Sequence, residues 1–169
     1  MIKSDIKNYK VTFGSYLKGM FTGHAFNVVL LYRVGNWLVR HKVKVLPDRV
    51  KYKMLKKYAC EISPYAQIGE ALMIHHSTGI VIGHEVIIGE HCEIFQNVTI
   101  GSNRKEMNGR YMPVIGNNVS IGSGAVVVGA ICIGNNVIIG ANSYVDKDIP
   151  DNVIVAGVPA KIIRRRLDV

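Results

Sequence analysis

Cysteine is scarce in this chain, and long apolar runs are absent. Its three cysteines (Cys60, Cys92 and Cys132) are odd in number and far apart among 169 residues, so they fit neither a disulfide framework nor a zinc site. No apolar run reaches the ~18 residues that a transmembrane helix needs. Lysines recur through the first eighteen residues, where a signal peptide would have its apolar region. We therefore expect a cytoplasmic protein.

Acidic residues are scarce in the first third of the chain. Residues 1–60 contain thirteen Lys/Arg against two Asp/Glu, a balance of +11, whereas residues 61–169 contain eight against ten, a balance of −2. A basic segment indicates nucleic acid, an anionic membrane or an acidic partner. The sequence has no helix-turn-helix, zinc or stacking-aromatic signature, so we expect no nucleic-acid partner.

A six-residue period controls the chain from Ile62 onward. β-branched aliphatic residues recur in three runs with a step of six, and glycine directly follows eight of them. The thirteen positions are Ile62, Ile68, Ile74, Ile82, Ile88, Ile94, Ile100, Ile115, Ile121, Val127, Ile133, Ile139 and Val145. A hexapeptide period matches neither an α-helix nor a two-residue strand alternation. It predicts a parallel β-helix in which three hexads make one triangular coil.

Two breaks interrupt this period. The step from Ile74 to Ile82 is eight residues, and the step from Ile100 to Ile115 is fifteen. Ile82 and Ile100 are eighteen residues apart, so they should lie on the same face in successive coils. We therefore expect the two insertions to be neighbours in space and to carry the functional site, because function resides on loops that a rigid scaffold positions.

The N-terminal region has helical spacing instead. Apolar residues in 27–40 recur on one side of a helix, Pro47 suits the first turn of a second helix over 48–58, and 5–20 is a weaker third helix. We expect residues 1–60 to form a basic helical region, 61–150 the β-helix and 151–169 a capping tail. The helices would cap the open first coil or mediate oligomer contacts; the alternative is contact with a membrane surface.

Histidines gather at the first break. His75 and His76 are adjacent, so on a strand they point to opposite faces and are poorly placed to chelate one metal ion together. His84 and His91 follow in consecutive hexads with no third ligand in a matching place, which indicates solvent-facing turn residues. A single histidine as general base suits the pattern better than metal chemistry, because imidazole ionises near neutral pH.

Four stretches of the chain resemble the serine O-acetyltransferase family in order and spacing. They are Ile74-His75-His76-Ser77-Thr78-Gly79-Ile80-Val81-Ile82-Gly83, Gln96-Asn97-Val98-Thr99-Ile100-Gly101, Ile121-Gly122-Ser123-Gly124-Ala125 and Ala156-Gly157-Val158-Pro159-Ala160-Lys161. The resemblance covers about residues 61 to 163 and implies a left-handed parallel β-helix of hexapeptide repeats, a mainly β fold with a short helical N-terminus. The His-His pair and the N-terminus also look like capsule and colanic-acid O-acetyltransferases.

The resemblance also implies roles for individual residues. The catalytic histidine falls on His76, and the carboxylate that orients it falls on Glu61, where the family usually has Asp. Acetyl-CoA, with no metal, would be the acetyl donor. The residues expected to bind it are Gly101, Ser102, Ser123, Ala141 and Lys161. His76 would take the proton of an acceptor hydroxyl, and the hydroxyl oxygen would attack the thioester directly. Glu61 would act as the carboxylate of a catalytic triad does, but no acyl-enzyme would form.

Two departures from the family pattern concern the acceptor. The Asp before the catalytic histidine is His75 here, and the histidine of the Arg-His-Pro motif is Met112, within Arg110-Tyr111-Met112-Pro113. Serine needs partners for an ammonium and a carboxylate, whereas a sugar hydroxyl needs neither. We therefore expect His75, Arg110, Tyr111 and Met112 to line a site for a sugar of a polysaccharide precursor, lipid-linked or free.

Other functions and an assembly follow from the same pattern. L-serine is the alternative acceptor, and an inactive scaffold or metal-dependent chemistry are further alternatives. Because the family places its sites between subunits, the resemblance implies a homotrimer, or two trimers joined through the N-terminus. The basic N-terminus also leaves open a peripheral association with a membrane.

Overall fold

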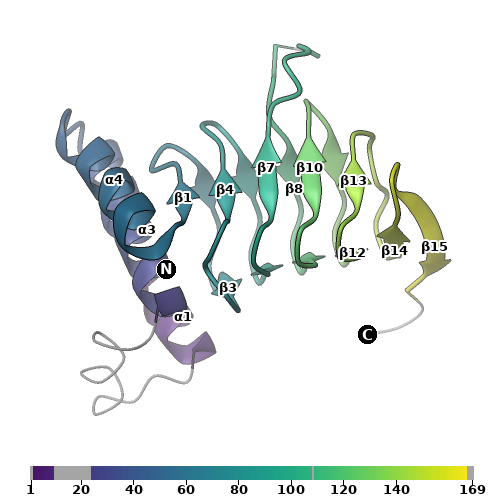
Figure 1. Ribbon diagram of the computed structural model, residues 1–169, viewed down its shortest axis with the longest axis horizontal. Coiled ribbons are helices and arrows are strands. Elements are labelled where there is room, and N and C mark those ends of the chain that lie inside the picture. The colour runs from purple at the N-terminus through teal and green to yellow at the C-terminus, as the bar shows by residue number, and fades with distance from the viewer. Residues whose placement is uncertain (1, 10–23, 108, 167–169) are drawn as a thin grey trace.

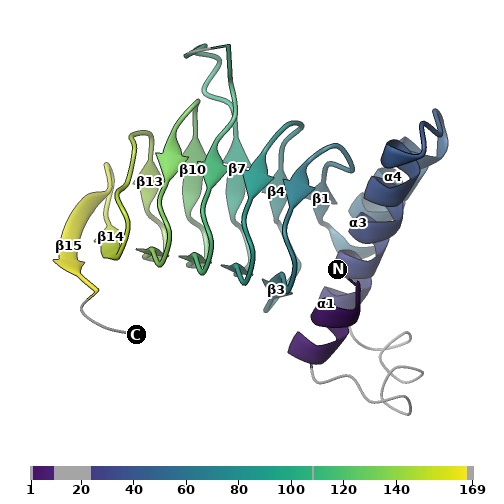
Figure 2. The ribbon, with the colours of Figure 1, turned by 180° about the vertical axis from the view of Figure 1, so that it is seen from behind.

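A three-sided coil of short strands, closed at one end by helices, forms this chain (Figures 1 and 2). The computed structural model describes residues 2–9, 24–107 and 109–166. The helices are α1 (Ile2–Asn8), α3 (His24–Arg40) and α4 (Leu46–Tyr58). None of them, within these ranges, is long and apolar enough to cross a bilayer.

The coil has three faces, each a sheet whose neighbouring strands come from successive coils. Face A consists of β1 (Glu61–Ile62), β4 (Val81–Ile82), β7 (Thr99–Gly101), β10 (Val126–Val128) and β13 (Tyr144–Val145). Face B consists of β2 (Gln67–Ile68), β5 (Ile87–Ile88), β8 (Val114–Ile115) and β11 (Cys132–Ile133). Face C consists of β3 (Met73–Ile74), β6 (Glu93–Ile94), β9 (Ser120–Ile121), β12 (Ile138–Ile139), β14 (Val153–Ala156) and β15 (Lys161–Arg165). All pairings are parallel except that of β14 with the C-terminal β15.

The hexapeptide positions form the interior of the coil. All thirteen aliphatic residues lie in strands, and each is at most 3% exposed. Burying one such side chain contributes about 1.5–3 kcal/mol, so the repeat itself stabilises the fold. The expected parallel β-helix is confirmed.

Three edges join the faces, and each is named here for the faces it connects. The AB edge comprises residues 63–66, 83–86, 102–113, 129–131 and 146–148. The BC edge comprises residues 69–72, 89–92, 116–119, 134–137 and 150–152. The CA edge comprises residues 75–80, 95–98, 122–125 and 140–143.

The two breaks of the repeat lie on different edges, so the expectation that they are neighbours is wrong. Ile82 does pair with Ile100 on face A. However, the first insertion precedes β4 and lies on the CA edge, whereas the second follows β7 and projects from the AB edge (Figure 1). The two therefore lie at opposite ends of adjacent strands, separated by the width of face A. Five or six residues at about 3.3 Å each make this width roughly 15–20 Å.

The N-terminal helices cap the first coil, as expected. Tyr32 donates a hydrogen bond to the carbonyl of Ala66 (2.8 Å) and accepts one from the backbone of Ile68 (3.1 Å). Asn36 donates to the carbonyl of Pro64 (2.9 Å). Val28, Val29, Tyr32, Met54 and Tyr58 belong to the same apolar core as the strands. The helices thus satisfy strand groups that would otherwise face solvent.

A buried ion pair strengthens this cap. Arg33 and Asp5 are 4% and 1% exposed, and the Arg33 Nε lies 2.8 Å from the Asp5 carboxylate. The same guanidinium donates to the carbonyls of Ile68 (2.7 Å) and Gly69 (2.6 Å), while Asp5 accepts from the backbone of Leu72 (3.2 Å). Helices α1 and α3 are thereby joined to the first turn of the BC edge.

The expected helices over 27–40 and 48–58 correspond to α3 and α4. The third expected helix, over 5–20, corresponds only in part to α1, and residues 10–20 lie outside the described ranges. The division of the chain into 1–60, 61–150 and 151–169 stays a prediction.

Candidate active site

The first break forms a wide turn on the CA edge. Ile80 takes the inward position that Thr78 would occupy in a regular hexad, and Ile80 is fully buried whereas Thr78 is exposed. The backbone of Gly79 has a φ of +72°, and a side chain there would overlap the Asn97 side chain of the next coil. The Gly79 N–H donates to the carbonyl of Ala59 (2.7 Å), which anchors the turn to the start of the coil.

His75 and His76 emerge from this turn into different surroundings. The His75 ring stacks on Phe95 with a centroid distance of 4.2 Å and an interplanar angle of 15°, and its Nε2 lies 3.3 Å from Glu93 Oε2. His76 is exposed, and no described residue forms a hydrogen bond with its ring. The imidazole of His76 is therefore free to meet a ligand, whereas His75 is held by Phe95 and Glu93 of the next coil.

Glu61 lies beside the turn without contacting His76. Its backbone N–H donates to the carbonyl of Ile80 (2.8 Å), so β1 and the turn are adjacent. Its carboxylate forms an ion pair with Lys51 of α4 (3.5 Å), and both side chains are about two-fifths exposed. Within the described ranges, no hydrogen bond joins Glu61 to His76. Their pairing stays a prediction, with Lys51 as a competing partner that the sequence interpretation missed.

Backbone N–H groups along the CA edge are open to solvent. At the corner of each later coil, Gln96, Ser123 and Ala141 have backbone N–H groups with no acceptor among the residues that the structure describes. The Gln96 side-chain oxygen is also buried there without a partner. Unpaired backbone donors are uncommon unless water or a ligand takes them. The edge therefore presents a row of donors that begins beside His76.

Of the residues expected to bind acetyl-CoA, Ser123, Ala141 and Lys161 follow this row. Lys161 begins β15, beyond the last complete coil. Five strand spacings of about 4.8 Å separate β3, which precedes His76, from β15, so the row spans roughly 24 Å from His76 to Lys161. Gly101 and Ser102 instead lie where β7 enters the long loop on the opposite edge. The expected donor site is therefore divided between two edges of the chain.

The loop residues expected to bind the acceptor also lie on the AB edge. Arg110 donates to Cys132 Sγ (3.5 Å), and Tyr111 donates to Glu106 (2.9 Å). Met112 is partly buried and packs against the core, with its sulfur placed over Gly83. The structure places these three residues on one edge, each with a different partner, and away from His76 of the same chain.

The cysteines of the coil are poorly suited to act as nucleophiles. Burial raises the pKa of Cys60 to about 12 and that of Cys92 to about 11, so both thiols stay protonated at neutral pH. Cys132 is exposed on face B. Cys92 and Cys132 are thus interior and wall residues, as expected, which favours direct transfer over an acyl-enzyme.

His84 and His91 lie on other edges of the coil. His84 and His91 are exposed on the AB and BC edges, which confirms the interpretation of them as solvent-facing turn residues. Within residues 2–9, 24–107 and 109–166, no group of three His, Cys, Asp or Glu side chains is arranged to hold a metal ion.

Phe95 and Glu93 were missed by the sequence interpretation. Their link to His75 has a signal in the sequence, because one coil is eighteen residues and the first break adds two. Residue 75 therefore faces residue 95 in the next coil, as the pairing of Ile74 with Ile94 shows.

Comparison with known proteins gives a consistent picture. Residues 112–147 match the family model described as bacterial transferase hexapeptide (six repeats). A serine acetyltransferase of Synechococcus elongatus is 39% identical over 140 residues, which cover 83% of this chain and 57% of that protein. The chain thus spans about half the length of the curated relatives it matches.

Solved structures agree with this comparison. The serine acetyltransferase of Neisseria gonorrhoeae superposes with a TM-score of 0.88 at 33% identity, covering 99% of this chain and 65% of that one. A serine acetyltransferase solved in complex with CoA gives a TM-score of 0.84 at 29% identity, covering 96% and 68%. These similarities confirm the left-handed form of the β-helix.

Proposed function

The chain belongs to the bacterial hexapeptide transferases, and on this basis we propose that it transfers an acetyl group from acetyl-CoA to the hydroxyl of L-serine. The row of open donors on the CA edge carries this proposal. It begins at His76 and passes Ser123 and Ala141 toward the basic strand β15. Acetyl-CoA is an extended molecule whose arm has amide carbonyls that can accept from these donors, and whose phosphates can meet the basic residues of β15.

The proposed mechanism uses His76 as general base. Its free imidazole accepts the proton of the acceptor hydroxyl while the oxygen attacks the thioester carbonyl, and the tetrahedral intermediate then expels the thiolate, which takes up the proton. Glu61 would orient the ring and stabilise the imidazolium by leaving Lys51 for His76. Backbone N–H groups of the edge would stabilise the oxyanion.

We propose that the complete site forms between copies of the chain. His76 lies on the CA edge and Arg110 on the AB edge, and face A separates them within one chain. A cyclic assembly in which each copy's AB edge meets its neighbour's CA edge would bring the two together, with face A toward the symmetry axis. A homotrimer satisfies this arrangement.

L-serine is the acceptor that the relatives favour. The sequence interpretation placed a polysaccharide sugar first and L-serine second, and the similar proteins are serine acetyltransferases. No comparison supports a lipid-linked acceptor or membrane association. Arg110 remains available for the carboxylate of an amino acid.

The test is a measurement of thiol release from acetyl-CoA with L-serine and with a panel of neutral sugars. Saturable turnover with L-serine, and none with the sugars, is the expected result. Turnover with a sugar but not with L-serine would restore the first interpretation. Absence of turnover with every acceptor would favour an inactive scaffold.

A further inference from the structure

His75, at the start of the CA edge, is held by two neighbours from the next coil. Its ring lies parallel to Phe95, and its Nε2 is 3.3 Å from Glu93 Oε2. Phe95 fixes the plane of the ring, and the bond to one carboxylate oxygen fixes the position of Glu93. His75, the neighbour of the proposed base in the chain, is therefore bonded to the carboxylate of Glu93.

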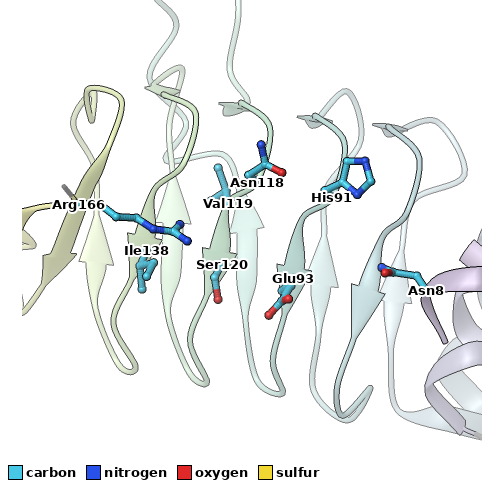
Figure 3. A pocket seen from close by; sticks show the side chains of 8 residues that line it. All are labelled: Asn8, His91, Glu93, Asn118, Val119, Ser120, Ile138 and Arg166. Atoms are coloured by element: carbon cyan, nitrogen blue, oxygen red, sulfur yellow. The ribbon is translucent and has the colours of Figure 1, made fainter. Parts of the chain in front are cut away.

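Glu93 opens onto a hollow of face C. Its side chain is 49% exposed and lines a cavity of about 430 Å³. Figure 3 shows Glu93 beside Ser120, with the amide of Asn8 at the helical end and Arg166 reaching over Ile138 at the other. A carboxylate has two acceptor oxygens. With one oxygen bonded to His75, the other remains free to bind a ligand beside His75.

Charge identifies the ligand group that Glu93 would bind. The proposed acceptor carries an ammonium two carbon atoms from its hydroxyl, so the group that binds the ammonium must lie beside the base. The segments that lead from face C into the CA edge are residues 73–79, 93–97, 120–124 and 138–142, and Glu93 is their one carboxylate. Glu61, on face A, is assigned to His76.

We propose that Glu93 recognises the ammonium group of the amino-acid acceptor, with His75 as the residue that positions its carboxylate. This assignment rests on the proposed serine acetyltransferase function. It also accounts for His75 in place of the family's Asp, because the carboxylate that binds the ammonium would come from Glu93 in the next coil. The acceptor hydroxyl then faces His76, one residue away from His75 in the chain.

The experiment compares L-serine with 3-hydroxypropionate, which has the same hydroxyl and carboxylate but no amine. Steady-state kinetics are measured for the full chain, for Glu93→Gln and for Glu93→Asp. The matched control is Glu90→Gln, which changes an exposed glutamate on the BC edge of the same coil. Because Glu93 is exposed, these variants should fold, and circular dichroism verifies this.

We expect Glu93→Gln to raise the KM for L-serine at least about tenfold, since a charged partner is lost. The KM for acetyl-CoA and the rate with 3-hydroxypropionate should stay near the wild-type values. The preference for L-serine over 3-hydroxypropionate therefore falls at least about tenfold. Glu93→Asp should retain part of the preference, and Glu90→Gln all of it.

Two results would overturn the assignment alone. One is a Glu93→Gln variant that keeps the wild-type preference for L-serine over 3-hydroxypropionate. The other is an equal loss of activity with both acceptors, which would show that Glu93 only supports His75. If the wild-type chain turns over no L-serine at all, the proposed function fails first, and this assignment fails with it.

Discussion

The BC and CA edges run along the same β-helix but differ in how their backbone donors are satisfied. On the BC edge, side-chain oxygens of Asn117, Asn135 and Asp151 accept from the backbone N–H of the preceding coil at 2.7–2.8 Å. At the first turn, Asp5 accepts from the backbone N–H of Leu72, and Arg33 donates to the carbonyl of Ile68. On the CA edge, the corresponding N–H groups of Gln96, Ser123 and Ala141 have no acceptor among the described residues.

This difference suggests that one edge serves stability and the other serves ligand binding. On the BC edge these backbone donors are already bonded, whereas on the CA edge the corresponding donors remain available to a ligand. The CA edge also carries the wide turn with His76, so the open donors and the free imidazole lie on one side of the molecule. We infer that the BC edge holds the coils together and that the CA edge binds and reacts.

The largest expected effect is on catalysis at the CA edge. His76→Ala should lower turnover roughly 10²–10⁴-fold, the usual contribution of a general base. The control is His84→Ala, an exposed histidine on the AB edge whose ring contacts Tyr65. Thiol-release kinetics at saturating acetyl-CoA measure both. A His76→Ala variant as active as His84→Ala would contradict the division of roles.

A large effect on stability is expected at the first turn of the BC edge. Arg33→Met leaves Asp5 buried without its partner, and such a loss typically costs about 3–5 kcal/mol. Urea unfolding of the variant measures it. The double variant Asp5→Leu/Arg33→Met should recover part of the loss, because no uncompensated charge remains. If the double variant is less stable than Arg33→Met, the ion pair is not the cause.

A smaller effect distinguishes the two edges directly. Asn135→Ala removes the acceptor for the Asn117 N–H and should destabilise the chain by about 1 kcal/mol. Ser123→Ala, at the corresponding corner of the CA edge, should leave the unfolding free energy unchanged. The two unfolding midpoints, measured side by side, are the readout. Equal losses would mean that the edges do not differ.

A pH-dependent effect concerns the buried thiols. The pKa of Cys60 is raised from 9.0 to about 12 and that of Cys92 from 9.0 to about 11, both through burial. Their contribution to stability is therefore complete below pH 9 and is lost as pH rises toward 11–12, because only the unfolded thiols ionise. Unfolding at pH 8 and pH 10.5 measures this. At pH 8, iodoacetamide should label Cys132 alone, because the thiols of Cys60 and Cys92 are buried.

The repeat could be predicted because its physics is local. A buried aliphatic residue every sixth position is sufficient to place Ile82 beside Ile100, and the structure pairs them. The edge on which each insertion falls could not be predicted in the same way. An insertion before one strand and an insertion after the next have the same spacing signal but lie at opposite ends of face A.

Contacts between distant side chains were beyond the sequence pattern. The Asp5–Arg33 pair joins residues twenty-eight positions apart in the helical region, where no period relates them. Glu93 could have been linked to His75 only by counting one coil plus the two extra residues of the turn. In the proposed assembly, His76 and Arg110 meet only between neighbouring copies, which a single chain's periodicity does not encode.

Complementation between inactive chains tests the central claim, that the reacting edge of one copy is completed by the loop of another. His76→Ala and Arg110→Ala chains are purified separately, unfolded together and refolded as a mixture. In randomly mixed trimers, about a quarter of the sites combine an intact His76 with an intact Arg110 from a neighbour, so serine-dependent thiol release should return to about that fraction. A mixture no more active than the two variants refolded apart would contradict the account.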